Sequence, residues 1–187
     1  MKSLVSRVYS ILNSHFGSLH WWPGDSPFEV IVGAILTQNT AWTNVEKAIN
    51  LLKVNNLLSI KALRIAKLDI IQKNIRPSGF FVQKSERLKR LIGLIDSEFN
   101  GSIQLMADYP LKELRTKLLE LNGIGPETAD SILLYALQKP VFVVDAYTRR
   151  IFGRIGLFDG SETYEEVRSV FEKNIASEKF NQYHALI

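Results

Sequence analysis

The sequence predicts an all-α protein. Apolar residues recur at helical spacing through almost the whole chain. Ser26-Pro27-Phe28-Glu29 has the form of a helix start, with a capping serine, a proline at the first helical position and a glutamate three residues after the cap. Only residues 140–144 look extended, and one β-branched run without a partner makes no sheet.

The elements follow in order along the chain. Leu4, Val8 and Ile11 begin the first helical pattern. The run from Phe28 to Leu36 is almost wholly apolar, so its helix should be central. Periodicity then predicts helices at about 41–54, 59–74 and 80–98. Two amphipathic helices with leucine and alanine stripes should cover about 111–119 and 129–137. The last three helices should lie at about 145–156, 161–173 and from 177 onward.

Composition excludes several classes of protein. Of the 187 residues, 46% are apolar and 22% are charged, which excludes wholesale disorder. The absence of cysteine excludes disulfides, thiolate zinc sites and cysteine-ligated iron–sulfur clusters within these residues. The first 20 residues lack a signal-peptide core, and no apolar stretch is long enough to span a membrane, so we expect an intracellular protein. The net charge of +4 permits a polyanionic partner.

The segment 121–130 is suited to binding phosphate. Gly123 and Gly125 permit positive φ and leave no Cβ in the way of a close partner, while Ile124 can insert into the core. Pro126 opens a helix whose first amides point outward and can receive a nucleic-acid phosphate. A G-x-G alone is more often an ordinary turn. Its position between two amphipathic helices favours a helix–hairpin–helix DNA-binding element.

Asp145 follows the buried run 141–144, twenty residues after Gly125. Its position is typical of a helix N-cap. Capping and chemistry are compatible, because a carboxylate pinned at a helix start is already oriented. Arg149, Arg150 and Arg154 follow within two turns and form either a phosphate-binding group or a solvated face.

All three tryptophans lie between positions 21 and 42. Trp21-Trp22-Pro23 precedes the capping box, and Trp42 follows the polar segment 37–40. Indole faces bind flat, electron-poor rings and cations. A single tryptophan is more often a core residue, but three beside a polar segment favour a pocket.

These residues resemble the endonuclease III superfamily of helix–hairpin–helix DNA glycosylases. The resemblance runs from about Leu4 to Ile187 and depends on residues 36–40, the hairpin and the Val144-Asp145 pair. It implies two helical lobes with the active-site cleft between them. One lobe would be a six-helix barrel of residues 23–131 that ends in the hairpin, and the other would combine residues 1–22 with 132–187.

The resemblance also implies roles for single residues. Asp145 would be the catalytic carboxylate, and Gln38 would fill the gap left in the duplex by the flipped nucleotide. Phosphate binding would fall to the hairpin residues Asn122, Gly123, Ile124, Gly125, Glu127 and Thr128. Glu127 occupies the position of the Schiff-base lysine of bifunctional members, and a carboxylate forms no imine. We therefore expect a monofunctional glycosylase that uses water and has no β-lyase activity.

Within the superfamily, the chain looks most like the 3-methyladenine DNA glycosylases. Two further features support this narrower resemblance: the segment 76–80 and an aromatic residue two positions after Thr40. It implies base excision repair of alkylated purines in double-stranded DNA, with a base pocket formed by Trp21, Trp22, Pro23 and Trp42. The alternatives are an endonuclease III-like glycosylase for oxidised or mismatched bases and a non-catalytic DNA-binding protein.

Further expectations concern cofactors and surroundings. No metal is expected, and a [4Fe–4S] cluster would require the natural protein to continue past Ile187 into the superfamily's four-cysteine loop. We expect a monomer on chromosomal DNA in the cytoplasm, with no membrane partner.

Tyr147 should pack in the interior and His184 should lie on a surface or lobe interface. The basic cluster on the 80–98 helix should be a solvated face or a DNA contact: Lys84, Arg87, Lys89 and Arg90.

Overall fold

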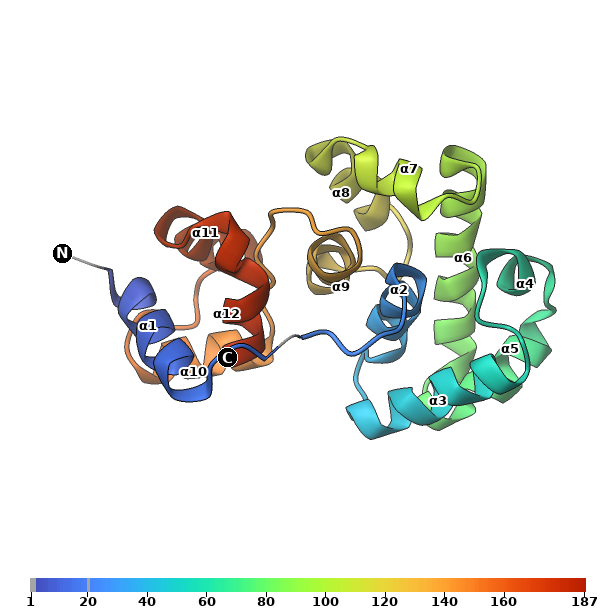
Figure 1. The fold of residues 1–187 in the computed structure, drawn as a ribbon, viewed down its shortest axis with the longest axis horizontal. Coiled ribbons are helices and arrows are strands. Elements are labelled where there is room, and N and C mark those ends of the chain that lie inside the picture. The colour runs from blue at the N-terminus through green and yellow to red at the C-terminus, as the bar shows by residue number, and fades with distance from the viewer. Residues whose placement is uncertain (1–2, 20) are drawn as a thin grey trace.

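The computed structural model describes residues 3–19 and 21–187 and consists of helices in two groups (Figure 1). One group contains α1 (Leu4–Phe16), α10 (Ala146–Arg154), α11 (Tyr164–Asn174) and α12 (Phe180–Leu186). The other contains α2 (Pro27–Leu36), α3 (Trp42–Val54), α4 (Ile60–Ile65), α5 (Leu68–Ile75), α6 (Phe81–Phe99), α7 (Ile103–Asp108) and α8 (Leu111–Leu119). Helix α9 (Pro126–Ser131) lies between them. No strand occurs in the described residues, so the all-α prediction is confirmed.

Three short helical turns complete the chain: η1 (Arg76–Ser78), the π-helix η2 (Ile132–Ala136) and η3 (Ser177–Lys179). Because η2 continues α9 directly, the second helix of the hairpin changes its winding after one and a half turns. Such π-turns are rare and often occur at functional sites.

Helix α2 is the centre of the larger group. Every residue from Phe28 to Leu36 is buried, including Glu29. The predicted capping is present, since the Ser26 side chain accepts a hydrogen bond from the Glu29 amide at 3.2 Å. Helix α2 packs against α3, α6, α9 and η2, so its C-terminal end is held from several sides.

The structure differs from the predicted helices at two places. The segment 59–74 forms two helices because Ala66 and Lys67 have extended backbones between α4 and α5. The apolar pattern continues across this break, so periodicity could not reveal it. Helix α7 was not predicted because its six residues are too short for a repeating stripe, although Ser102 caps it.

The smaller group joins both ends of the chain. The Tyr183 hydroxyl of α12 donates a hydrogen bond to the Val5 carbonyl oxygen at 2.8 Å, and Ser6 Oγ donates to the Asn174 carbonyl oxygen at 2.8 Å. Phe142 stacks on Phe171 with ring centroids 4.3 Å apart. The chain therefore passes between the groups twice, before α2 and after η2 (Figure 1).

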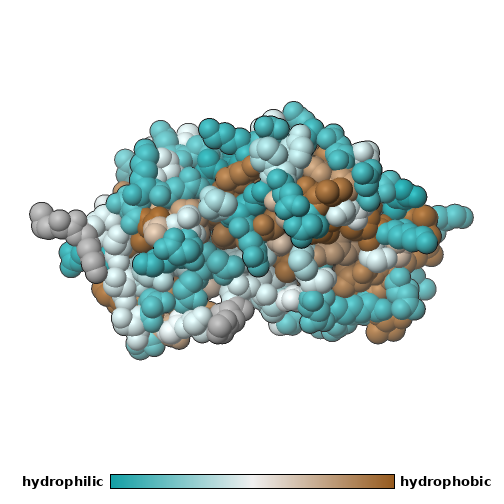
Figure 2. Space-filling model, turned by 45° about the horizontal axis from the view of Figure 1, so that its top comes forward, coloured by the Kyte–Doolittle hydropathy of each residue, from teal (hydrophilic) through white to brown (hydrophobic). Residues whose placement is uncertain are grey.

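The surface is mixed in character. Figure 2 shows a mainly hydrophilic face with hydrophobic patches between the charged side chains. No helix in the described residues has both the length and the apolar character needed to cross a membrane.

Candidate nucleic-acid interface and active site

The hairpin joins α8 to α9, and its two glycines differ. Gly123 has φ of +89°, whereas Gly125 has φ of −90°. A Cβ on Gly123 would lie 2.3–2.8 Å from the side chain of Arg87, but a Cβ on Gly125 would have no neighbour within 4 Å. The close partner at Gly123 is therefore Arg87, which corrects the expectation that both glycines leave room for a bound molecule. Ile124 is buried beneath them, as predicted.

Gln38 is bound to the hairpin. Its Nε2 donates to the Gly123 carbonyl oxygen at 3.1 Å and to Thr128 Oγ1 at 2.9 Å, and its Oε1 accepts a hydrogen bond from Arg87. Thr128 is itself buried, so its hydroxyl is turned to Gln38 and away from solvent. A cavity of about 450 Å³ lies at this junction and is lined by residues that include Asn39, Gly125, Glu127, Ser131 and Tyr164.

The expectation of a solvated or DNA-contacting basic face on α6 is wrong for Lys84. This side chain is fully buried, and its Nζ donates to the carbonyl oxygens of Leu36 at 2.8 Å and Ser78 at 2.6 Å. Burial lowers the pKa of Lys84 to about 8, with a smaller effect from the charge of Arg87. Lys84 thus explains the segment 76–80, because it ties η1 to the end of α2.

The rest of this basic group lies nearer the surface. Arg90 donates to the Asn122 carbonyl oxygen at 3.2 Å, and Lys89 donates to the Arg64 carbonyl oxygen at 2.7 Å. Arg87 and Arg90 therefore reach the hairpin directly. Asn122 is exposed beside Arg90, which also pairs with Glu86 at 3.1 Å, so this edge of the hairpin is open to solvent.

Asp145 is the N-cap of α10, as predicted. Its Oδ1 accepts hydrogen bonds from the Thr148 amide at 2.7 Å and from Thr148 Oγ1 at 2.8 Å. The preceding residue is fixed too, since the Val144 amide donates to the Tyr164 hydroxyl at 3.3 Å. The side chain of Asp145 is 22% exposed, so the carboxylate is both oriented and accessible.

His184 and Tyr135 lie behind this carboxylate. His184 Nε2 is 3.8 Å from Asp145 Oδ2, and His184 Nδ1 is hydrogen-bonded to the Tyr135 hydroxyl. Burial lowers the pKa of His184, and the charge of Asp145 only partly opposes this effect. The imidazole is therefore neutral at neutral pH. His184 lies between the two helix groups, which agrees with the expected interface position. Tyr135 was not predicted at all.

The three indoles form one cluster. Trp22 contacts Trp42 with ring centroids 5.4 Å apart, and Trp21 lies about 6 Å from each of them. Trp22 also contacts Tyr135, at 5.1 Å. A continuous row of rings thus leads from Trp42 through Trp22 and Tyr135 to His184, beside Asp145. The three tryptophans are therefore connected to Asp145 through Tyr135 and His184.

The close packing of the indoles depends on α2. A Cβ on Gly33 would lie 3.5 Å from Trp22 Nε1 and 3.7 Å from the Trp42 ring, so glycine lets both rings lie directly on the helix. Trp21 is 39% exposed and forms the outer edge of the cluster. Trp22 Nε1 is buried without a hydrogen-bond partner, which leaves one donor free within the cluster.

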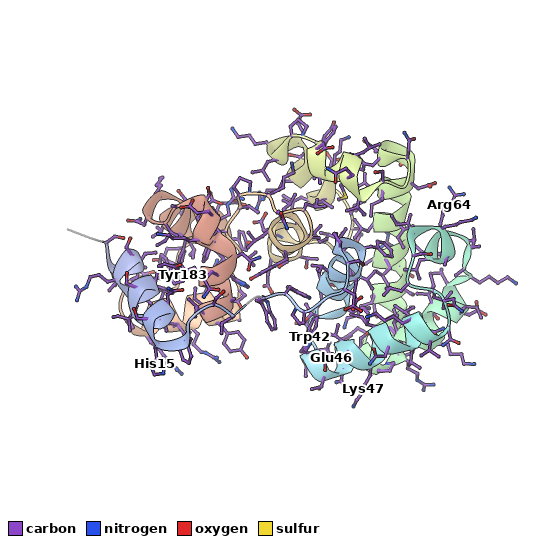
Figure 3. All side chains as sticks on the ribbon, in the orientation of Figure 1. His15, Trp42, Glu46, Lys47, Arg64 and Tyr183 are labelled. Atoms are coloured by element: carbon purple, nitrogen blue, oxygen red, sulfur yellow. The ribbon has the colours of Figure 1, made fainter. Side chains whose placement is uncertain are left out.

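A second cavity, of about 420 Å³, opens beside Trp42 and Pro23. Figure 3 shows Trp42 and Glu46 together near the start of α3, where Trp42 Nε1 donates to Glu46 Oε1 at 3.0 Å. Asp25 and Glu29 also line this cavity, and Lys53 pairs with both, at 2.7 and 2.8 Å. Three carboxylates against one lysine give the cavity an excess of negative charge.

Glu127 reaches the cleft from the start of α9. Burial raises the pKa of Glu127, and the negative charge of Asp145 raises it further, so the two carboxylates interact electrostatically. Tyr147, expected in the interior, is 56% exposed and lies against the Arg150 guanidinium, 4.6 Å from the ring centroid. The prediction that Tyr147 packs is wrong because its helix turns this position outward.

The described residues contain no group of three or more histidine, cysteine, aspartate or glutamate side chains that could hold a metal ion. The chain has no cysteine. Iron–sulfur clusters are held by cysteine thiolates, so these residues do not fit a [4Fe–4S] cluster.

Comparisons with known proteins agree with this geometry. A candidate DNA repair glycosylase of Methanocaldococcus jannaschii is 46% identical over 98% of this chain and 85% of its own length. Endonuclease III of Sulfolobus acidocaldarius is 30% identical over 86% of this chain and 70% of its own length. Both relatives match most of this chain.

Solved structures show the same fold. The H. pylori 3-methyladenine DNA glycosylase bound to 1,N6-ethenoadenine superimposes with a TM-score of 0.87, at 29% identity, over 97% of this chain and 94% of that one. An endonuclease III–DNA complex gives a TM-score of 0.82 at 20% identity, over 97% of this chain and 81% of that one. Residues 32–177 match the family described as "HhH-GPD superfamily base excision DNA repair protein". The chain belongs to this superfamily and is a DNA glycosylase of base excision repair.

Proposed function

We propose that this protein is a monofunctional glycosylase that flips alkylated purines such as 3-methyladenine out of double-stranded DNA and releases them by hydrolysis. The observation that carries the proposal is the row of aromatic rings that leads from Trp42 to the carboxylate of Asp145. The similarity to the H. pylori 3-methyladenine DNA glycosylase supports it. We propose that the protein acts as a monomer on chromosomal DNA.

The base pocket suits a flat cation. An alkylated purine carries positive charge, and a cation over a desolvated indole gains about 2 kcal/mol beyond the stacking of about 1–3 kcal/mol per base. The carboxylates of Asp25, Glu29 and Glu46 beside Trp42 add to this preference. A neutral purine still stacks but lacks the cation–indole interaction and the attraction to the carboxylates, so the pocket selects by charge as well as by shape.

The chemistry needs little acid catalysis. A positively charged base leaves as a neutral molecule, and the sugar then acquires positive charge. Asp145, ionised at the cleft, would stabilise that charge and orient the attacking water. A DNA phosphate would bind at the open face of Gly125, where main-chain amides donate hydrogen bonds to its oxygens. Gln38 would leave the hairpin and fill the gap in the duplex.

Base release from a panel of duplexes tests the substrate class. The panel carries methylated purines, 1,N6-ethenoadenine, an oxidised pyrimidine or a G·T mismatch. We expect release of the methylated purines, with a loss of about 100-fold or more in Asp145→Asn at unchanged DNA affinity. Trp42→Ala should slow release by about tenfold or more, as expected from the stacking contribution.

Asp108→Asn, on the exposed end of α7, is the matched control and should behave as wild type. Near-normal turnover of Asp145→Asn would reduce Asp145 to a helix cap. Release of only the oxidised or mismatched base would replace the alkylpurine assignment with the endonuclease III-like one.

Borohydride trapping tests the absence of lyase activity. Glu127 cannot form an imine with an abasic site, so wild type should give no covalent adduct with abasic-site DNA under conditions that trap an endonuclease III. Glu127→Lys restores the amine at this position and serves as the matched comparison. An adduct formed efficiently by wild type would contradict the monofunctional mechanism.

A further inference from the structure

We propose that Tyr135 and His184 are positioning residues for Asp145, in which His184 donates a hydrogen bond from Nε2 to Asp145 Oδ2 and Tyr135 selects the tautomer that makes this donation. The inference rests on the proposed role of Asp145 in base release. It adds two residues, from η2 and α12, to the machinery around that carboxylate.

The geometry leaves one oxygen and one nitrogen facing each other. Thr148 occupies Oδ1 of Asp145 with two hydrogen bonds, so Oδ2 remains. His184 Nε2 is buried, has no hydrogen-bond partner and lies 3.8 Å from that oxygen. The separation exceeds a hydrogen bond, but catalytic hydrogen bonds are often long without substrate and shorten in the complex.

The tautomer follows from the partners on each side. A neutral imidazole has one donor and one acceptor nitrogen. The carboxylate of Asp145 favours the proton on Nε2, so Nδ1 becomes the acceptor and the Tyr135 hydroxyl donates to it. Burial supports this assignment because it lowers the pKa of His184 and raises the pKa of Tyr135, which keeps both side chains neutral.

A second carboxylate lies near this pair. Burial raises the pKa of Glu127, and the charge of Asp145 raises it further. A hydrogen bond to the charged form favours ionisation. The donation from His184 therefore favours the charged carboxylate and, together with the two hydrogen bonds from Thr148 to Oδ1, fixes the plane of the carboxylate. Phe142, which packs edge-on to His184, adds no charge on its other side.

The pH dependence of single-turnover base release tests the pair. His184→Phe removes the donor, so the acid limb should move up by about one pH unit and the rate at neutral pH should fall by about tenfold. Tyr135→Phe keeps the ring in contact with Trp22 but loses the hydroxyl, and it should shift the limb in the same direction by less. His184→Gln retains an N–H donor and should restore part of the rate.

Two readouts separate positioning from simple stability and from the substrate proposal. DNA affinity should stay within about twofold in all three variants, because none of the substituted side chains belongs to the phosphate-binding residues 122–128. The titration of the Asp145 carboxyl, followed by 13C NMR without DNA, should show a higher pKa in Tyr135→Phe than in wild type. Wild type without base release on any lesion would contradict the proposed function alone. Variants with the wild-type Asp145 titration would overturn the positioning pair.

Discussion

At the scale of single residues, the two hairpin glycines carry different requirements. Gly123 combines a positive φ with the side chain of Arg87 pressed against its Cα, whereas Gly125 has an ordinary φ and an empty face. The sequence shows two equivalent glycines. The difference comes from a contact with α6, more than thirty residues earlier in the chain.

Alanine substitutions at the two positions should therefore have opposite consequences. Gly123→Ala should lower the free energy of unfolding by about 1–3 kcal/mol, because the φ is unfavourable and Arg87 must move away from Gln38. Gly125→Ala should change it by less than about 0.5 kcal/mol yet weaken DNA binding, since its methyl group would face the phosphate. Urea unfolding and DNA titration measure both effects. Equal destabilisation by the two variants would refute the distinction.

At the scale of elements, α6 aligns the hairpin with the end of α2. Lys84, Arg87 and Arg90 are three residues apart, so each lies next to the following one in a row along the helix surface. Lys84 holds the Leu36 carbonyl oxygen, Arg87 holds Gln38 and Arg90 holds the hairpin. The helix was predicted from its apolar stripe, but the use of its polar face was not.

The stability cost of burying Lys84 should depend on pH. Its pKa is about 8 in the folded protein and near 10.5 in an exposed lysine, so between these values only the unfolded chain binds the proton and stability rises with pH. Each pKa unit is worth about 1.4 kcal/mol, so wild type should gain roughly 2–3 kcal/mol relative to Lys84→Met across this range. Urea unfolding of both proteins at pH 7.5 and pH 10 measures the difference. The same difference at both pH values would show that Lys84 does not deprotonate.

At the scale of the whole molecule, a buried ion-pair network joins the two helix groups. Asp130 of α9 is fully buried, and Arg115 of α8 binds it through two hydrogen bonds of 2.6 and 3.1 Å. Arg168 of α11 approaches the same carboxylate at 3.6 Å, and Glu165 pairs with both arginines. The hairpin's second helix is thereby fastened to the group that carries Asp145.

Sequence patterns predicted most of the helices, the hairpin, the capping by Asp145 and the clustering of the indoles, because the signals for each lie close together in the chain. They could not predict Tyr135 beside His184, which are 49 positions apart and share no spacing rule. The burial of Lys84 was missed for the same reason, since its two acceptors are carbonyl oxygens from other helices. Long-range polar contacts leave no periodic trace in the sequence.

The pairing of α1 with α11 and α12 has a consequence for the order in which the protein folds. During synthesis, the first helix emerges long before the partners that supply Asn174 and Tyr183. Contacts across so many residues form late because the chain must first lose the entropy of the intervening loop. Helices α2–α9 can assemble on the ribosome while α1 has no partner, and the surroundings of Asp145 are complete only when α12 supplies His184.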